Sequence, residues 1–265
     1  MDRSYWHKQT DQPLFPDLLW SRPESRQHAG KLLIIGGNLQ GFSAVAHAYT
    51  NSVTAGIGTT RVIMPDSIQR VVKSLIETAE FAPSTPSGSF SQKALAELLA
   101  SAAWSDGVLL AGDLGRNSET AILIEKFIEK YQGHLIITDD SIDYVTTAAN
   151  AILNRDNTCL VLSLSQLQKL AIESRYRHAI TFDMELTRLV DWLHSFTAMH
   201  TISIVVQHHE VLFVAIGGEV STTKSSLTDK HTWLIPSASR AAVWWLQNPS
   251  KPFEAITSSM FAAIT

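Results

Sequence analysis

The stretch KLLIIGGNLQGFSAVAHA, residues 31–48, decides the fold class. Its residues 32–35 form a short apolar run between Gly30 and Gly36, which is typical of a strand buried on both faces of a sheet. Small side chains then recur at helical spacing over residues 43–53, so this segment is predicted to be a helix that lies close to the sheet. A second apolar run at 60–64 completes a strand–helix–strand unit, in which the two strands are parallel.

The same alternation continues along the chain. The pattern predicts helices over 91–103, 118–131 and 184–196, strands over 107–112, 134–138 and 159–163, and consecutive strands within 201–223. We therefore expect one three-layer α/β domain over residues 1–265: a mainly parallel sheet flanked by helices, with antiparallel strands near the C-terminal end and strand 32–36 central. Residues 1–30 are a polar lead-in. The Pro-, Ser- and Gly-rich segment 81–90 is predicted to be a loop, and a simple surface connection is expected in preference to a cover over a cleft.

The composition is that of a globular protein with a sizeable core, because 45% of the 265 residues are hydrophobic and 17% are charged. The net charge is -4 and lysines and arginines do not cluster, so we expect no nucleic-acid or membrane partner and a small-molecule ligand instead. No apolar window reaches the length of a membrane span and the N-terminus is polar, so we expect a cytoplasmic protein. The single cysteine, Cys159, lies in an apolar run and is expected to be a buried thiol.

Common catalytic and metal-binding motifs are missing. In GGNLQG, Asn38 stands where a dinucleotide-binding fingerprint has its middle glycine, and neither a Walker A motif nor Gly-x-Ser-x-Gly occurs. His208, His209 and Glu210 are consecutive at a predicted hairpin tip, so they point to opposite faces, and we expect no metal site. Asp139 and Asp140 follow a strand, where they serve either a ligand or a turn and helix cap.

Residues 22–66 resemble the start of the ADP/ATP-dependent NAD(P)H-hydrate dehydratases, a branch of the ribokinase-like superfamily that repairs hydrated nicotinamide cofactors. Gly36, Gly37 and Asn38 stand at the family's Gly-Gly-Ser, Ala44 at the alanine of its Tyr-x-Gly-Ala-Pro, and 56–58 at its Gly-Ala-Gly. The segment AGDLGRN (111–117) is similar to the family's Gly-Pro-Gly-Leu-Gly, and LIITDDSI (135–142) to its strand ending in Asp-Ala-Asp-Ala-Leu.

The resemblance implies a ribokinase-like fold and a site for hydrated NAD(P)H. The implied cofactor-binding residues are Gly37, Asn38, Ala44, Asp113, Gly115 and Asp140, and Asp140 is also the candidate for catalysis. We expect the Ala44 side chain at the mouth of the cleft, because it lies in the first turn of the predicted helix.

The family's later motifs are altered in this chain. Its Thr-Pro-His-x-Gly-Glu falls on residues 163–168, which contain neither histidine nor glutamate, and its Lys-Gly falls on Gln207 and His208. Its Gly-x-Gly-Asp, which forms an anion hole at a helix start, has no counterpart in residues 226–247, and the closest placement puts it on residues 237–240. Glycines there let backbone N–H groups approach a phosphate, and an arginine cannot act as a base at neutral pH. The nucleotide region, if retained, is Gln207, Ser237, Ser239 and Arg240, and we expect nucleotide binding to be lost or strongly weakened.

Three functions remain open at this point. The first is a divergent NAD(P)H-hydrate dehydratase, a lyase in which ATP or ADP with Mg drives removal of water from hydrated NAD(P)H. The second is a catalytically inactive homologue that retains a ligand cleft or acts through its surface as an interaction protein, with or without a cofactor. The third is a small-molecule kinase. The resemblance also implies a homo-oligomer, with which the apolar end SSMFAAIT (258–265) is compatible. Trp244 and Trp245 are read as part of an apolar helix at the core or a subunit interface rather than as a stacking platform.

Overall fold

The computed structural model describes residues 3–20, 22–73, 76, 79–225 and 232–262. Within these residues ten strands form one sheet in the order β1-β10-β9-β8-β7-β6-β5-β2-β3-β4. The strands are β1 (Trp6–Gln9), β2 (Lys31–Gly36), β3 (Thr59–Pro65), β4 (Ala79–Ala82), β5 (Gly107–Gly112), β6 (His134–Thr138), β7 (Thr158–Ser163), β8 (Ser203–His208), β9 (Val211–Ile216) and β10 (Glu219–Lys224). Of these, β9 runs antiparallel to both of its neighbours, and the other described pairs are parallel.

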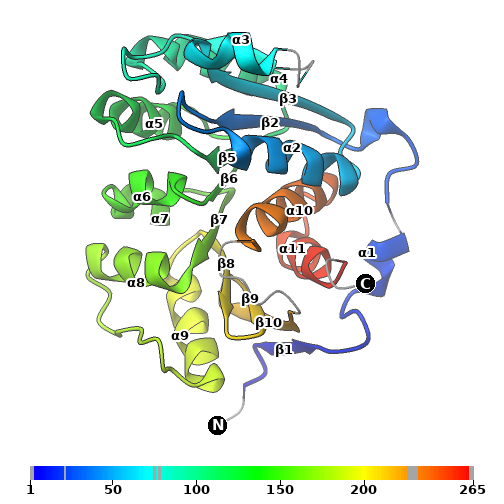
Figure 1. The fold of residues 1–265 in the computed structure, drawn as a ribbon. Coiled ribbons are helices and arrows are strands. Elements are labelled where there is room, and N and C mark those ends of the chain that lie inside the picture. Colours follow the sequence, from blue (N-terminus) through cyan, green and yellow to red (C-terminus); the bar gives the residue numbers. More distant parts are fainter. Residues whose placement is uncertain (1–2, 21, 74–75, 77–78, 226–231, 263–265) are drawn as a thin grey trace.

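Helices cover both faces of this sheet and make a three-layer α/β fold (Figure 1). One face carries α2 (Ser43–Thr54), α10 (Leu234–Gln247) and α11 (Pro252–Phe261), against which α1 (Pro16–Trp20) packs. The other face carries α4 (Leu95–Trp104), α5 (Ser118–Lys130), α6 (Ser141–Thr146), α7 (Ala149–Leu153), α8 (Leu164–Glu173) and α9 (Leu186–Met199). The short α3 (Gln69–Val72) follows β3, near the β4 edge.

Strand β2 shows why this sequence produces three layers. Leu32 and Ile34 point into the core beneath α2 and α10, whereas Leu33 and Ile35 point into the core beneath α4 and α5, and all four are fully buried. Alternate residues of a strand face opposite sides, so an uninterrupted apolar run requires cover on both. The strand lies inside the sheet between β5 and β3, although nearer to the β4 edge than to the middle.

The lead-in does more than precede the domain. Residues 6–9 form β1, which pairs in parallel with β10 and closes that edge of the sheet. Gln9 is buried, and its side-chain amide donates hydrogen bonds to Thr223 Oγ1 at 2.9 Å and to the Thr257 carbonyl at 3.1 Å. The first part of the chain is thereby tied to residues more than two hundred positions away.

The C-terminal helices are packed inward. Trp244 and Trp245 are each 3% exposed, which confirms that they belong to an apolar helix in the core. Met260 and Phe261 are also buried within α11, so the apolar stretch expected to be compatible with an oligomer interface is instead used inside the fold; residues 263–265 lie outside the described residues. None of the described helices has the length and apolar character needed to cross a bilayer.

Candidate functional site

The carboxyl ends of β2 and β5 are held very close together. Gly37 N–H donates to the Gly112 carbonyl at 3.0 Å, and a Cβ added to Gly36 would lie 2.4 Å from that same oxygen. No side chain fits at Gly36, so a glycine is needed there for the packing of the two strand ends, and Gly37 has a left-handed backbone with φ of 84°. The role of Gly37 in binding a cofactor stays a prediction.

A hydrogen-bonded loop network surrounds this junction. Asn38 Nδ2 donates to the Asp113 carbonyl at 2.6 Å, and the Gln40 N–H donates to Asn38 Oδ1 at 2.7 Å. The Asp113 carboxylate accepts the Ala44 N–H at 2.8 Å. Asn38 and Asp113 therefore stabilise the loops at the ends of β2 and β5 whether or not a ligand binds.

The expectation that the Ala44 side chain faces the mouth of a cleft is wrong. Ala44 is 5% exposed and belongs to the core between α2 and the sheet. The first turn of α2 directs this methyl group toward the sheet. Because the side chain is small, the helix can pack close to the sheet at this point. A contact between the Ala44 side chain and a cofactor is thereby ruled out, and only its backbone faces the loop of Asp113.

A cavity of about 560 Å³ opens beside the carboxyl ends of β5 and β6. Two of the predicted residues, Gly115 and Asp140, line it together. Arg116 and Asn117 extend the wall at the start of α5, and the remaining polar lining comes from Asp143, Tyr144, Thr147 and Lys169. This is the edge of a parallel sheet at which α/β proteins bind ligands, and the volume lies in the usual range for small-molecule sites.

Asp140 has an unusual environment within this cavity. Burial raises the pKa of its carboxyl group from 3.8 to about 6, and the negative charges of Asp139, Asp113 and Asp143 act in the same direction. The Leu114 N–H, 3.5 Å from Asp140 Oδ1, opposes the shift. A carboxyl with this pKa holds its proton below pH 6 and can donate a hydrogen bond or a proton to a ligand.

Lys169 supplies a positive charge to the cavity lining. Its Nζ lies 3.3 Å from Asp143 Oδ1, and both side chains are more than half exposed to solvent. Such an exposed ion pair contributes little to stability. It leaves the Lys169 ammonium and the neighbouring carboxylate available at the cavity surface.

Tyr144 fixes the loop that carries Gly115. Its hydroxyl group donates to the Gly115 carbonyl and accepts the Asn117 N–H at 3.5 Å. Burial raises the pKa of the Tyr144 hydroxyl, so it stays protonated and remains a donor. Tyr144, which lies on α6, thus holds the Gly115 loop in place as part of the cavity wall.

The segment 81–90, expected to be a simple surface loop, begins with the last two residues of β4, and the rest of it contacts the candidate site. Asn117 Nδ2 donates to Ser87 Oγ at 2.8 Å, and Thr120 Oγ1 donates to the Phe90 carbonyl at 2.7 Å. Ser89 is buried, and its Oγ would lie 2.7 Å from a Cβ added to Gly115. The loop therefore packs directly against the Gly115 loop and the start of α5.

The segment aligned with Thr-Pro-His-x-Gly-Glu begins α8 instead. Ser163 and Gln166 form a capping box, in which Ser163 N–H donates to Gln166 Oε1 at 3.0 Å and Gln166 N–H donates to Ser163 Oγ at 3.3 Å. Gln166 Nε2 also donates to the Asp139 carbonyl at 2.8 Å. These polar side chains thus hold the backbone at Asp139, the residue before Asp140.

The predicted nucleotide residues lie away from this cavity. Helix α10 begins at Leu234 after an N-cap at Trp233, so residues 237–240 lie within the helix. The placement of the Gly-x-Gly-Asp motif had put them at a helix start. Ser237 and Ser239 are at most 1% exposed, and Ser239 Oγ donates to the Ile235 carbonyl at 2.8 Å. The residues 226–231 that precede this helix lie outside the described part.

Arg240 and Gln207 complete that set. Burial lowers the pKa of the Arg240 guanidinium, and its Nη1 has no hydrogen-bond partner among the described residues. Gln207 lies at the end of β8 and donates to the His209 carbonyl at 3.1 Å. Neither lines the cavity of Gly115 and Asp140, and α10 covers the opposite face of the sheet from α5 and α8.

Several lining residues were not foreseen. Arg116 and Asn117 directly follow a predicted site residue, and Tyr144 follows Asp140 by one helical turn. Their proximity in sequence to predicted site residues could have indicated that they line the same cavity. Lys169 carried no such signal, because it reaches the cavity only through the packing of α8 beside α6.

Comparison with known proteins supports these expectations about fold and relationship. No family model matches the chain. The bifunctional NAD(P)H-hydrate repair enzyme of Moorella thermoacetica is 27% identical to it over 138 residues. That match covers 51% of this chain and 26% of the relative, so it spans about a quarter of the relative's length.

Solved structures share the fold over almost the whole chain. A ribokinase-like superfamily protein of Enterococcus faecalis superposes with a TM-score of 0.74 at 17% identity, covering 98% of this chain and 87% of that one. The ADP/ATP-dependent NAD(P)H-hydrate dehydratase of Bacillus subtilis, co-crystallised with ATP and Mg²⁺, gives 0.62 at 10% identity, covering 95% and 87%. The chain therefore has a ribokinase-like fold and, over half of its length, is similar in sequence to an NAD(P)H-hydrate repair enzyme.

Proposed function

We propose that this protein binds hydrated NAD(P)H in the cavity at the ends of β5 and β6, as a divergent relative of the NAD(P)H-hydrate dehydratases. The observation that carries the proposal is that Gly115 and Asp140, from two separate family-like motifs, line one cavity of about 560 Å³. Similarity in sequence to the Moorella thermoacetica repair enzyme supports the choice of ligand.

Asp140 is the residue suited to act on such a ligand. Dehydration breaks the carbon–oxygen bond of the hydrated ring. The leaving oxygen takes a proton from the Asp140 carboxyl group and departs as water, and the carboxylate then accepts a proton from the adjacent ring carbon as the double bond forms. A pKa of about 6 suits both steps near neutral pH.

The nucleotide-dependent step is proposed to be lost or strongly weakened. In the dehydratases that this chain resembles, ATP or ADP with Mg drives the reaction, and a small-molecule kinase would also need phosphate at a helix start. Here Trp233, Leu234 and Ile235 are at most 7% exposed where α10 begins. Buried apolar side chains there favour the second function, a homologue that binds its ligand with little or no turnover.

Thermal unfolding and turnover together test the proposal. Hydrated NADPH is expected to raise the melting temperature of the protein, because a ligand that binds only the native state adds RT ln(1 + [L]/Kd) to stability. Asp140→Asn should keep most of this shift and abolish any residual formation of NADPH, whereas Asp11→Asn on the exposed surface should change neither. If hydrated NADPH and NADPH both leave the melting curve unmoved, the proposed ligand is wrong.

A further inference from the structure

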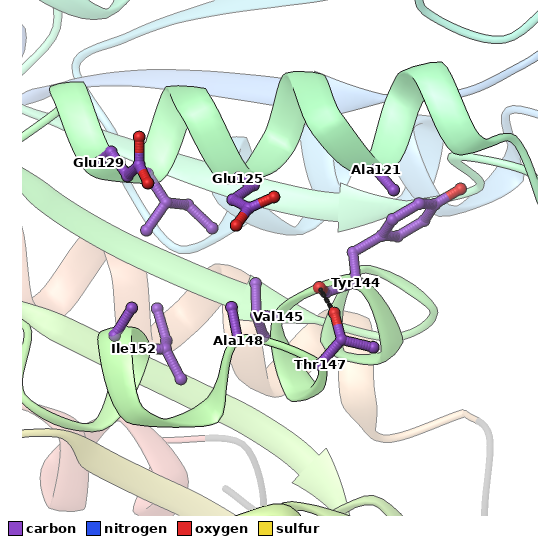
Figure 2. Close-up of a pocket in the computed structure, with 10 residues that line it drawn as sticks. Ala121, Glu125, Glu129, Tyr144, Val145, Thr147, Ala148 and Ile152 are labelled. Atoms are coloured by element: carbon purple, nitrogen blue, oxygen red, sulfur yellow. Dashed lines mark hydrogen bonds between the residues drawn. The ribbon is translucent and has the colours of Figure 1, made fainter.

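A second hollow lies between α5 and the α6–α7 segment (Figure 2). It adjoins the cavity, with which it shares Ala121, Tyr144 and Thr147. We call it the α5–α7 groove and define it by Glu125, Ile128 and Glu129 on α5 and by Ala148, Ala151 and Ile152 on the other wall. Its volume is about 70 Å³. A space of this size accommodates a short alkyl chain.

The floor of the groove is apolar. Ile128, Val145 and Ile152 are at most 8% exposed and belong to the core beneath this face of the sheet. The small side chains of Ala148 and Ala151 leave the space open above them. A hydrocarbon chain laid there would lose contact with water, which favours binding in proportion to the area covered.

One wall of the groove is negatively charged. Glu125 and Glu129 stand one helical turn apart on α5 and both line the groove, the Glu125 carboxylate lying on the side of α5 that faces it (Figure 2). Like charges four residues apart on a helix repel each other. Within the described residues no ion pair involves either carboxylate, so a cation placed between them would relieve this repulsion.

We propose that the α5–α7 groove binds a primary alkylammonium ion, with the alkyl chain over the apolar floor and the ammonium group beside Glu125 and Glu129. An anion of the same length would be repelled, and an uncharged analogue would gain only the apolar contact. A free small molecule is the favoured source, because the space holds one short chain and adjoins the ligand cavity. This inference does not depend on the identity of the ligand in that cavity.

Three probes of equal length test the proposal: pentylammonium, 1-pentanol and pentanoate. Titrations of the full chain, followed by amide chemical shifts in NMR spectra at low ionic strength, should show shifts confined to α5, α6 and α7. We expect pentylammonium to bind about five times more tightly than 1-pentanol, since exposed ion pairs contribute modestly. Pentanoate should bind more weakly than both, and salt should remove the advantage of the ammonium ion.

Paired variants separate charge from shape. Glu125→Gln/Glu129→Gln should make pentylammonium and 1-pentanol bind equally, whereas Glu24→Gln/Glu173→Gln, with the same change of net charge elsewhere, should leave the difference intact. Ala151→Leu should abolish binding of both probes by filling the space. Each variant is compared with the parent by its melting temperature, so that loss of folding is recognised.

Two results would overturn the proposal. One is equal affinity for the three probes in the parent protein, which would mean that the carboxylates make no contribution. The other is the absence of saturable shifts at α5 and α7 with a Kd below about 10 mM for pentylammonium.

Discussion

The carboxylate of Asp113, which directly follows β5, accepts the backbone N–H of Ala44 at 2.8 Å and thereby caps α2. Helix α2 needs this contact, because its own N-cap residue, Phe42, has no side-chain acceptor. Asp113 also holds a left-handed backbone conformation, with φ of 55°, at a position where the resembling family has glycine. At this position an aspartate that caps α2 thus stands in place of a glycine, which adopts the left-handed conformation more readily.

Replacing Asp113 is expected to lower stability in a defined order. Asp113→Ala loses the cap, which costs about 1 kcal/mol, and forces alanine into a left-handed conformation, which costs about 1 kcal/mol more. Asp113→Gly loses the cap but relieves the strain, so its melting temperature should fall between those of the parent and Asp113→Ala. Equal melting temperatures for the two variants would show that backbone strain is unimportant at this position.

Asp140 predicts a pH-dependent stability. Its folded-state pKa of about 6 lies above the ordinary 3.8, so between these values the folded protein binds the proton more tightly. Its contribution is therefore most favourable below pH 4 and is lost as the pH rises through 6, by at most about 3 kcal/mol. Asp140→Asn should raise the melting temperature at pH 8 and leave it nearly unchanged at pH 4.

The matched control for this prediction is Asp11→Asn, whose side chain is exposed. It should give the same melting temperature as the parent at both pH values. An Asp140→Asn variant that is no more stable than the parent at pH 8 would contradict the burial of a strained charge in the cavity.

Nucleotides are expected to leave the melting temperature unchanged. Millimolar ATP, ADP or AMP with Mg²⁺ would add about 2.7 kcal/mol to stability at a hundredfold excess over Kd if the site were intact. The burial of Ser237 and Ser239 within α10 predicts no such gain. The Bacillus subtilis dehydratase, which was co-crystallised with ATP and Mg²⁺, serves as the positive control, and a clear rise for this chain would restore a nucleotide-dependent reaction.

Arg155 is predicted to be the most sensitive charged residue of the core. It is 8% exposed, and its guanidinium donates to the carbonyls of Tyr131, Gly133 and Asp156 and to Thr158 Oγ1. Arg155→Met would remove these hydrogen bonds and leave the Asp156 carbonyl with the Thr158 hydroxyl as its donor, at a cost of about 3 kcal/mol. Chemical denaturation should show this loss, whereas Arg188→Met on the exposed surface of α9 should stay within about 0.5 kcal/mol of the parent.

The local signals in the sequence were strongest where one pattern dominated. The predicted strands 107–112 and 134–138 match β5 and β6 residue for residue, because apolar runs this short, set between helical segments, are typical of strands buried on both faces. The short α6 and α7 and the strand β1 gave no comparable pattern. Their conformation depends on the neighbours against which they pack.

The sequence by itself determined the fold class, the buried strands and the loops that contain Gly37, Gly115 and Asp140, since the hydrophobic period and the positions of glycines are local properties. Only the tertiary structure decided which of these residues share a cavity. It buried the Ala44 side chain, assigned the Asp113 carboxylate to capping α2 and brought Lys169 into the lining of the same cavity as Asp140. The physical reason is that burial, electrostatic shifts and hydrogen-bond partners arise from elements far apart in the chain, and no periodicity along one segment encodes them.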